Sequence, residues 1–207
     1  MNAEVHIPVG LATAAGMSVV INQMKTDNLS TLAICLGCAV VGAVLPDIDA
    51  NGESKAKKEF RKILVYLGIF SATLLGYSIK NGTLVSLFSS FIHSTQCIGG
   101  IAFLICCILG YFSGHRCFTH RLTGFIAFSM SFNYMIGDTR MALWFMWGFF
   151  SHQAIDMLNK RKIQWLYPIS RVDFSLYLCY AESKLSTVIG YVSLGLFSLF
   201  MLISYNG

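Results

Sequence analysis

Charged residues are scarce in this chain. Only 12% of its 207 residues are Asp, Glu, Lys or Arg, whereas a typical soluble domain carries about 25%. Hydrophobic residues make up 55%, and only 3 prolines interrupt the apolar runs. This composition excludes an ordinary soluble globular protein. It predicts an integral membrane protein with an all-α fold, because a membrane-spanning segment must satisfy its backbone hydrogen bonds internally.

The long apolar runs set the expected architecture, since a span takes about 17–25 mostly apolar residues. The runs are Ile7–Met24, Leu29–Leu45, Ile63–Ile79, Cys97–Ser113, Leu122–Gly137, Met141–Ile155 and Ser186–Ser204. We predict a polytopic transmembrane helical bundle of about seven spans, forming a single integral membrane domain over residues 1–207. Six or eight spans are alternatives, because the serine-rich stretch Thr83–Thr95 can lie at the interface, re-enter the membrane or extend the next helix.

The first run is expected to be a retained span and not a cleavable signal peptide. No lysine or arginine precedes it, and Lys25 follows it, which is the reverse of the signal-peptide charge layout. The 7 cysteines predict no disulfide framework, because most lie within apolar runs and behave there as small hydrophobic residues. Cys35 and Cys38 have zinc-like spacing, but no second pair accompanies them.

The distribution of basic residues orients the bundle. With the N-terminus placed in the cytoplasm, twelve of the 15 Lys and Arg residues fall inside, and only Lys25, Lys80 and Arg140 fall outside. Positive residues favour the cytoplasmic side of a membrane. The net charge of +5 therefore reflects topology and attraction to anionic lipid, and requires no nucleic-acid partner.

The few histidines and several aspartates gather at that same cytoplasmic face, although neither residue type entered the charge count. The chain has only 5 histidines. The residues of this face are His6, Asp47, Asp49, His115, His120, His152 and Asp156. Imidazoles and carboxylates together suit zinc, manganese or iron. The set is too large for one tetrahedral site, so two ions about 3.5–4 Å apart are an alternative to one.

The predicted metal ligands are His6, Asp47, Asp49, His115, His152 and Asp156. Structural interpretations of the individual motifs stay open. The segment Val44–Ser54 can be a proline-ended helix followed by a capping acidic turn. His152 and Asp156 are four residues apart, so they share a helix face as co-ligands or as a local pair that fixes the helix end.

The segment GHRCFTHR, residues 114–121, separates two apolar runs. On a continuous helix His115 and His120 would be about 140° apart, so a helix break near Cys117 is needed to turn both into one site. The planar guanidinium of Arg116 suits a phosphate or a carboxylate. His120 is expected to be a metal ligand or a general acid. An ordinary basic interfacial loop is the alternative interpretation.

The order of these motifs resembles the YdjM-like family of bacterial inner-membrane proteins. The matching pieces are His6 with LATAAG, LPDIDANGES (45–54), GHRCFTH (114–120), SHQAIDML (151–158) and WLYP (165–168). They cover residues 1–168, beyond which only an extra span at about 186–204 is expected. The resemblance implies a membrane-bound metal-dependent hydrolase. The chain departs from the family at Cys117, where relatives keep glycine, at Arg121, where they keep serine, and at Ala50-Asn51, where His-Pro often follows LPDID.

Three functions follow from this pattern. The first is a hydrolase at the cytoplasmic face of the bacterial inner membrane, which acts on a phosphoester of a membrane lipid or lipid-linked substrate. The ligands predicted above would hold a divalent metal, zinc or manganese, and Arg116 and His120 would be the catalytic residues. The second is a metal or proton transporter, which the absence of matching acids in the outer halves of the spans disfavours. The third is a non-catalytic scaffold held together by a structural metal.

Overall fold

The structure, a computed structural model, describes residues 3–21, 29–49, 95–114, 116–160, 162–177 and 183–206. Its α-helices are α1 (Ala3–Val20), α2 (Leu29–Val44), α5 (Thr95–Phe112), α6 (Leu122–Ile136), α7 (Thr139–Leu158) and α8 (Lys184–Asn206), and a short 3-10 helix, η1 (Leu45–Asp49), continues α2. Within the described ranges there is no strand, and an isolated antiparallel bridge joins Ile163 and Phe174. The predicted all-α fold is confirmed for this part of the chain.

Three of the described helical segments are long and apolar enough to cross a membrane. They are Leu29–Asp49, Thr95–Phe112 and Lys184–Ile203. The apolar parts of α1 and α6 are shorter. The prediction of about seven spans is therefore not confirmed. The predicted span Ile63–Ile79, and Thr83–Thr95 apart from its last residue, lie outside the described residues.

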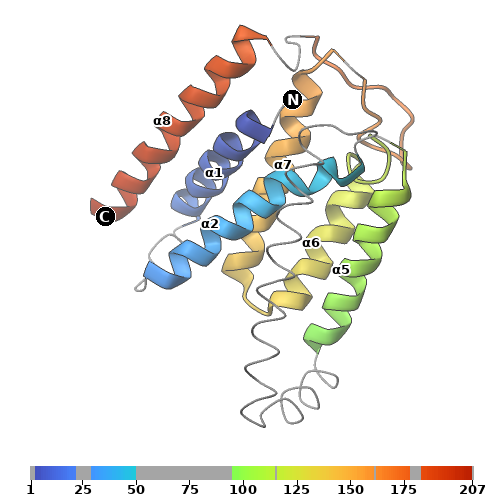
Figure 1. The fold of residues 1–207 in the computed structure, drawn as a ribbon, viewed down its shortest axis with the longest axis horizontal. Helices are drawn as coiled ribbons and strands as arrows, with labels where there is room; N and C mark the ends of the chain where they lie inside the picture. Colours follow the sequence, from blue (N-terminus) through green and yellow to red (C-terminus); the bar gives the residue numbers. More distant parts are fainter. Residues whose placement is uncertain are drawn as a thin grey trace.

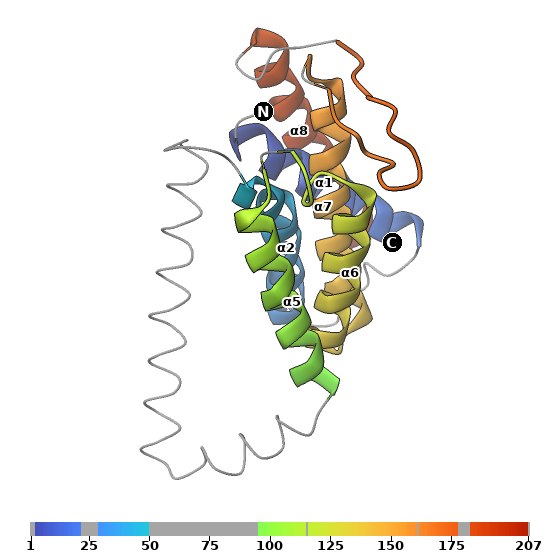
Figure 2. The same cartoon turned by 90° about the vertical axis from the view of Figure 1, so that its right-hand side faces the viewer.

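Helix α7 lies at the centre of the bundle and packs against α1, α2 and α6 (Figures 1 and 2). Helix α5 pairs with α6, and α8 packs along α1. The short η1 contacts α5, α2 and α7. The start of α1, the end of α2, the 113–121 turn and the end of α7 consequently meet at one end of the bundle.

The turn between α6 and α7 shows how local sequence sets the helix boundaries. Gly137 ends α6 with a left-handed φ of 69°, a conformation that glycine adopts without steric cost. Asp138 then caps α7, because its carboxylate accepts hydrogen bonds from the backbone N–H groups of Arg140 and Met141 at 2.8 and 3.2 Å. These boundaries lie close to those predicted from the apolar runs.

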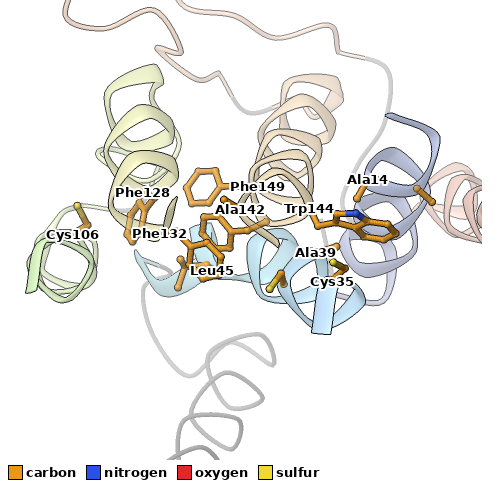
Figure 3. Packing of buried hydrophobic residues seen from close by; sticks show 13 residues of the cluster. Ala14, Cys35, Ala39, Leu45, Cys106, Phe128, Phe132, Ala142, Trp144 and Phe149 are labelled. Carbon is orange, nitrogen blue, oxygen red and sulfur yellow. The ribbon is translucent and has the colours of Figure 1, made fainter. Parts of the chain in front are cut away.

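The core between α5, α6 and α7 is largely aromatic (Figure 3). Phe132 and Phe145 stack with ring centroids 4.1 Å apart and an interplanar angle of 10°. Phe128 and Phe149 continue the cluster toward the end of the bundle that carries the histidines. Cys106 is buried beside these rings as a free thiol, in keeping with its predicted role as a small hydrophobic residue.

Candidate functional site

Close packing of α2 against α7 places the first site histidine. A Cβ atom on Gly148 would overlap the carbonyl oxygen of Ala39, and one on Gly42 would overlap that of Phe145. Small residues therefore let the two backbones approach, as is common between membrane helices. The approach brings Ala43 O within 2.6 Å of the Nδ1 atom of His152.

The Ala43 contact fixes which nitrogen of His152 carries the proton. A carbonyl oxygen only accepts hydrogen bonds, so Nδ1 is the donor and Nε2 keeps its lone pair. This Nε2 atom is buried and has no hydrogen-bond partner among the described residues. A histidine whose second nitrogen is held in this way is pre-oriented as a metal ligand.

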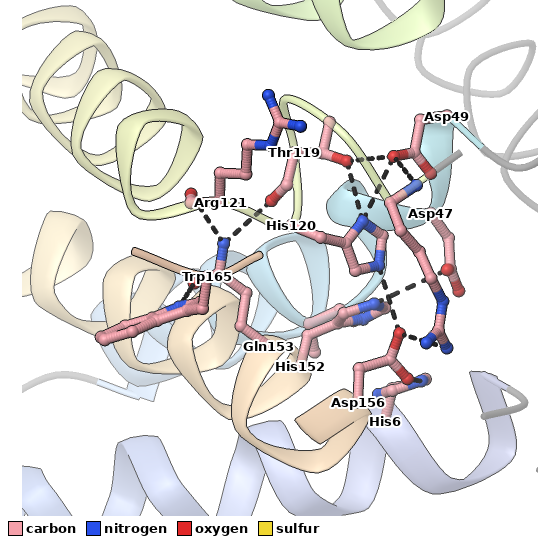
Figure 4. A network of polar contacts seen from close by, with 12 residues as sticks. His6, Asp47, Asp49, Thr119, His120, Arg121, His152, Gln153, Asp156 and Trp165 are labelled. Carbon is pink, nitrogen blue, oxygen red and sulfur yellow. Dashed lines mark hydrogen bonds and ion pairs between the residues drawn. The ribbon is translucent and has the colours of Figure 1, made fainter. Parts of the chain in front are cut away.

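Side chains from α1, η1, the 113–121 turn and α7 converge around this nitrogen (Figure 4). His6 of α1 stacks on His152, with ring centroids 3.8 Å apart and planes 15° apart. Asp47 Oδ1 lies 3.6 Å from His152 Nε2. Asp156 lies one helical turn beyond His152, with its Oδ1 3.7 Å from His6 Nε2 and its Oδ2 3.3 Å from His120 Nε2.

Two groups of three side chains place one ligand atom each within 4.8 Å of one another. The groups are His6, Asp47 and His152, and His120, His152 and Asp156. His152 belongs to both, so the groups form one continuous cluster. The predicted ligands His6, Asp47, His152 and Asp156 are thus brought together, whereas His115 lies outside the described residues and stays a prediction.

Asp49, also predicted as a ligand, is in neither group. Its Oδ2 atom instead accepts hydrogen bonds from the backbone N–H of Arg116 at 2.9 Å and from the hydroxyl of Thr119 at 2.6 Å. The same oxygen lies 3.2 Å from His120 Nδ1. Since the only hydroxyl proton of Thr119 goes to Asp49, Nδ1 of His120 donates and its Nε2 atom faces Asp156.

His120 is fully buried between two carboxylates. Burial lowers the pKa of His120, but hydrogen bonds with Asp156 and Asp49 and the charges of both carboxylates outweigh burial and raise the pKa to about 9. Without a metal, this imidazole is therefore cationic at neutral pH and links the 113–121 turn to α7.

The described residues of the 113–121 turn, 113–114 and 116–121, are non-helical, in agreement with the predicted helix break near Cys117. Arg116 is the residue that takes a left-handed φ, 63°. The backbone of Cys117 is not left-handed, so a cysteine costs no strain at this position of the turn. Thr119 does not cap α6. The N-cap residue of this helix is Arg121, which makes no side-chain capping hydrogen bond, and the hydroxyl of Thr119 donates to Asp49 instead.

Arg116, predicted to bind an anion, is paired inside the cluster. Its Nη2 atom donates to Asp156 Oδ2 at 3.0 Å, and its side chain is only 11% exposed. The guanidinium therefore lies beside the carboxylate that also faces His6 and His120.

The residues fit a divalent cation. Both nitrogens of His6 and the Nε2 of His152 are buried and have no hydrogen-bond partner among the described residues, and a buried polar atom without a hydrogen bond is costly. The surrounding donors are imidazole nitrogens and carboxylate oxygens, which suit zinc, manganese or iron.

A family model described as YdjM inner membrane protein matches residues 1–206. The chain belongs to the YdjM family. The match includes α8, so the YdjM resemblance extends past Pro168 and the last helix is part of the family fold. Membership of an inner membrane protein family, together with the apolar helices, supports a membrane location. No curated protein and no solved structure gives a significant match.

In this YdjM protein, sequence reasoning missed Gln153 and Trp165 as parts of the site. Gln153 is completely buried on α7 next to His152. Its amide bonds to the backbone on either side of His120 and to the indole of Trp165. An uncharged amide in an apolar helix beside a candidate ligand was the available signal.

Proposed function

We propose that this YdjM protein is a metal-dependent hydrolase that cleaves a phosphoester of a lipid or lipid-linked substrate at the cytoplasmic membrane face. The observation that carries the proposal is the buried cluster of His6, Asp47, His120, His152 and Asp156, in which both nitrogens of His6 and the Nε2 atom of His152 have no hydrogen-bond partner among the described residues. Such a donor set at the end of a membrane bundle is a default candidate for chemistry.

His6, Asp47, His152 and Asp156 would hold the metal, with His120 beside them. A divalent ion held there supplies Lewis acidity and lowers the pKa of water, which makes hydrolysis feasible at neutral pH. The chain's own contribution is a buried, largely preorganised donor set, in which the Ala43 carbonyl fixes the tautomer of His152.

The shared histidine bears on whether one ion or two are bound. His152 has a single nitrogen available, because Nδ1 donates to Ala43. The two groups of ligand atoms are therefore not independent sites. A second ion would have to be held by His120 and Asp156 without His152, so one zinc or manganese ion is the simpler occupancy.

Asp49 orients His120 in the cluster. A carboxylate on Nδ1 leaves Nε2 to face the cluster, which is the carboxylate–histidine arrangement of many metal sites. Metal-free His120 is cationic and carries a proton on Nε2, so as a ligand it would release this proton when the ion binds, whereas as a general acid it would keep the proton for the leaving group. Arg116 would meet the phosphate of the substrate, and it would have to exchange part of its contact with Asp156 to do so.

The non-helical segment 162–177 supports a lipid substrate. It is tied to the site through Trp165, yet it carries apolar side chains that protrude, among them Ile169, 81% exposed, and Leu176, 62% exposed. Exposed aliphatic side chains next to a site between apolar helices fit the acyl or isoprenoid part of a substrate. We retain the orientation with a cytoplasmic N-terminus and about seven spans, on the distribution of Lys and Arg.

One observation favours a second candidate, a structural metal site. His6, His120 and His152 are completely buried, and a closed, fully ligated ion would stabilise the helix ends without catalysis. Turnover distinguishes the two candidates.

The test uses the full-length protein in lipid nanodiscs. The metal content is measured together with phosphate release from a panel of phospholipids and isoprenoid phosphates, with zinc or manganese supplied. We expect His152→Ala and Asp156→Asn to lose both metal and turnover. Asp173→Asn is the matched control, because Asp173 lies on the exposed segment and pairs only loosely with Lys162, at 3.9 Å.

Metal retention without turnover on any substrate would favour the structural site. Equal metal content in the wild type and in both site variants would rule out these residues as ligands.

A further inference from the structure

Gln153 is a buried amide whose contacts all point away from the metal cluster. Its side chain is completely buried on α7. Its Nε2 atom donates to Thr119 O at 2.9 Å and to Arg121 O at 3.2 Å. Its Oε1 atom accepts from the indole Nε1 of Trp165 at 2.9 Å.

The partners leave the amide of Gln153 only one orientation. The indole N–H of Trp165 can only donate, so it requires Oε1, and the carbonyls of Thr119 and Arg121 can only accept, so they require Nε2. Both donor hydrogens and the acceptor are used. A buried polar group that is satisfied in this way is rigid, and a flipped amide would lose three hydrogen bonds.

These hydrogen bonds hold the backbone on both sides of His120. Thr119 and Arg121 are its immediate neighbours, and the next residue, Leu122, donates its backbone N–H to Trp165 O at 2.8 Å. On its other side, the His120 ring meets Asp49 and Asp156. The histidine is thus held through its backbone by one network and through its ring by another (Figure 4).

The network of Gln153 that holds the backbone around His120 also reaches the exposed segment 162–177. Trp165 belongs to this segment, which also contacts α7 and its end through the bonds from Leu176 N to Met157 O at 2.9 Å and from the Ser175 hydroxyl to Asn159 O at 2.6 Å. Within the segment, a bridge joins Ile163 and Phe174. Gln153 is the described side chain that joins Trp165 to the backbone around His120.

We propose that Gln153 is a positioning residue, which sets the place of His120 in the metal cluster and couples it to the segment 162–177 through Trp165. This inference rests on the proposed metal site. Without the amide, the carbonyls of Thr119 and Arg121 lose their donor, and the turn shifts relative to α7. His120 Nε2 then moves from its position 3.3 Å from Asp156 Oδ2.

The test is Gln153→Met, which keeps the length of the side chain but removes its hydrogen bonds. The probe is Co²⁺ alone, added to the full-length protein, and the readouts are its affinity and its visible absorption spectrum. We expect about 10- to 100-fold weaker binding, the range found when outer partners of metal ligands are removed. We also expect a changed spectrum, because a displaced His120 alters the coordination geometry, which a merely structural loss of stability would not do.

Gln164→Met is the matched control for Gln153→Met. It makes the same change in a side chain without a hydrogen bond among the described residues, and it should leave Co²⁺ binding unchanged. A second pair of variants tests Trp165. Trp165→Phe should alter the spectrum in the same direction as Gln153→Met. Trp147→Phe should not, because the indole nitrogen of Trp147 has no partner in the described part of the chain.

Identical Co²⁺ affinity and spectra for Gln153→Met and Gln164→Met would overturn the inference while leaving the metal site intact. No Co²⁺ binding by the wild type would instead count against the proposed function. In that case amide hydrogen exchange of the metal-free protein decides the positioning role. Faster exchange at Leu122 in Gln153→Met than in Gln164→Met supports it, and equal exchange refutes it.

Discussion

The variant Asp49→Asn tests whether Asp49 supports His120 through a hydrogen bond or binds the metal itself. Three donors converge on the Oδ2 atom of Asp49, from Arg116, Thr119 and His120. Hydrogen bonds to a charged group contribute about 1.5–3 kcal/mol, against about 0.5–1.5 kcal/mol for neutral ones. The amide keeps the shape but loses the charge, so each of the three bonds is weakened by about 1 kcal/mol.

Only the bond to His120 bears directly on the metal, while the other two hold the turn. We therefore expect Asp49→Asn to weaken metal binding by about 10- to 100-fold, as for other partners behind a ligating histidine. That range corresponds to about 1.4–2.8 kcal/mol, at 1.4 kcal/mol for each factor of ten. The number of ions bound per chain should not change.

The assay is competition for zinc with a chromophoric chelator, which gives both affinity and stoichiometry. Asp138→Asn is the matched control, because that carboxylate also accepts two hydrogen bonds, but it caps α7 at the opposite end of the helix. Asp49 would prove to be a ligand if Asp49→Asn abolished binding as fully as His152→Ala. The reasoning would also fail if Asp49→Asn and Asp138→Asn bound zinc equally well.

Three further predictions follow from the packing and the exposed segment. Gly148→Leu should abolish metal binding, because the leucine side chain would overlap the Ala39 backbone and separate α2 from α7. Metal titration of the folded variant measures this, and a retained affinity would contradict the prediction. Chelation of the metal should lower the melting temperature, since an ion at 100 times its Kd stabilises by about 2.7 kcal/mol, and a scan with unchanged melting would refute a bound ion. Ile169→Lys should raise the KM for a lipid substrate while leaving metal content unchanged, and equal KM values would show that this exposed side chain does not contact lipid.

The convergence of the site was predictable from topology. Histidine and aspartate lie at the ends of apolar runs that the Lys and Arg count assigns to one membrane face. Helix ends at one face of a bundle are the ends that can meet. His6, Asp47, His152 and Asp156, which are up to 150 residues apart, were named on this ground, and they lie in one cluster.

The division of roles inside the cluster was not predictable. Asp47 and Asp49 are equivalent in the sequence LPDID, but the tight winding of η1 directs one toward His152 and the other toward the 113–121 turn. The role of Gln153 depends on where the carbonyls of Thr119 and Arg121 lie in space. Every residue has a backbone carbonyl, so the sequence does not indicate which carbonyls accept a side-chain hydrogen bond.

The packing of α8 has a consequence for the order in which the protein is completed. Helix α8 packs along α1, where the ring of Phe200 lies against Gly16, and α1 carries His6. Helix α1 is therefore braced by α8, which the ribosome makes after every described donor of the cluster. A nascent chain that ends after α7 already contains all the described donors of the cluster. Its helix α1, which carries His6, would however lack its packing against α8. Premature termination within α8 would thus weaken the site, although α8 carries none of the described donors.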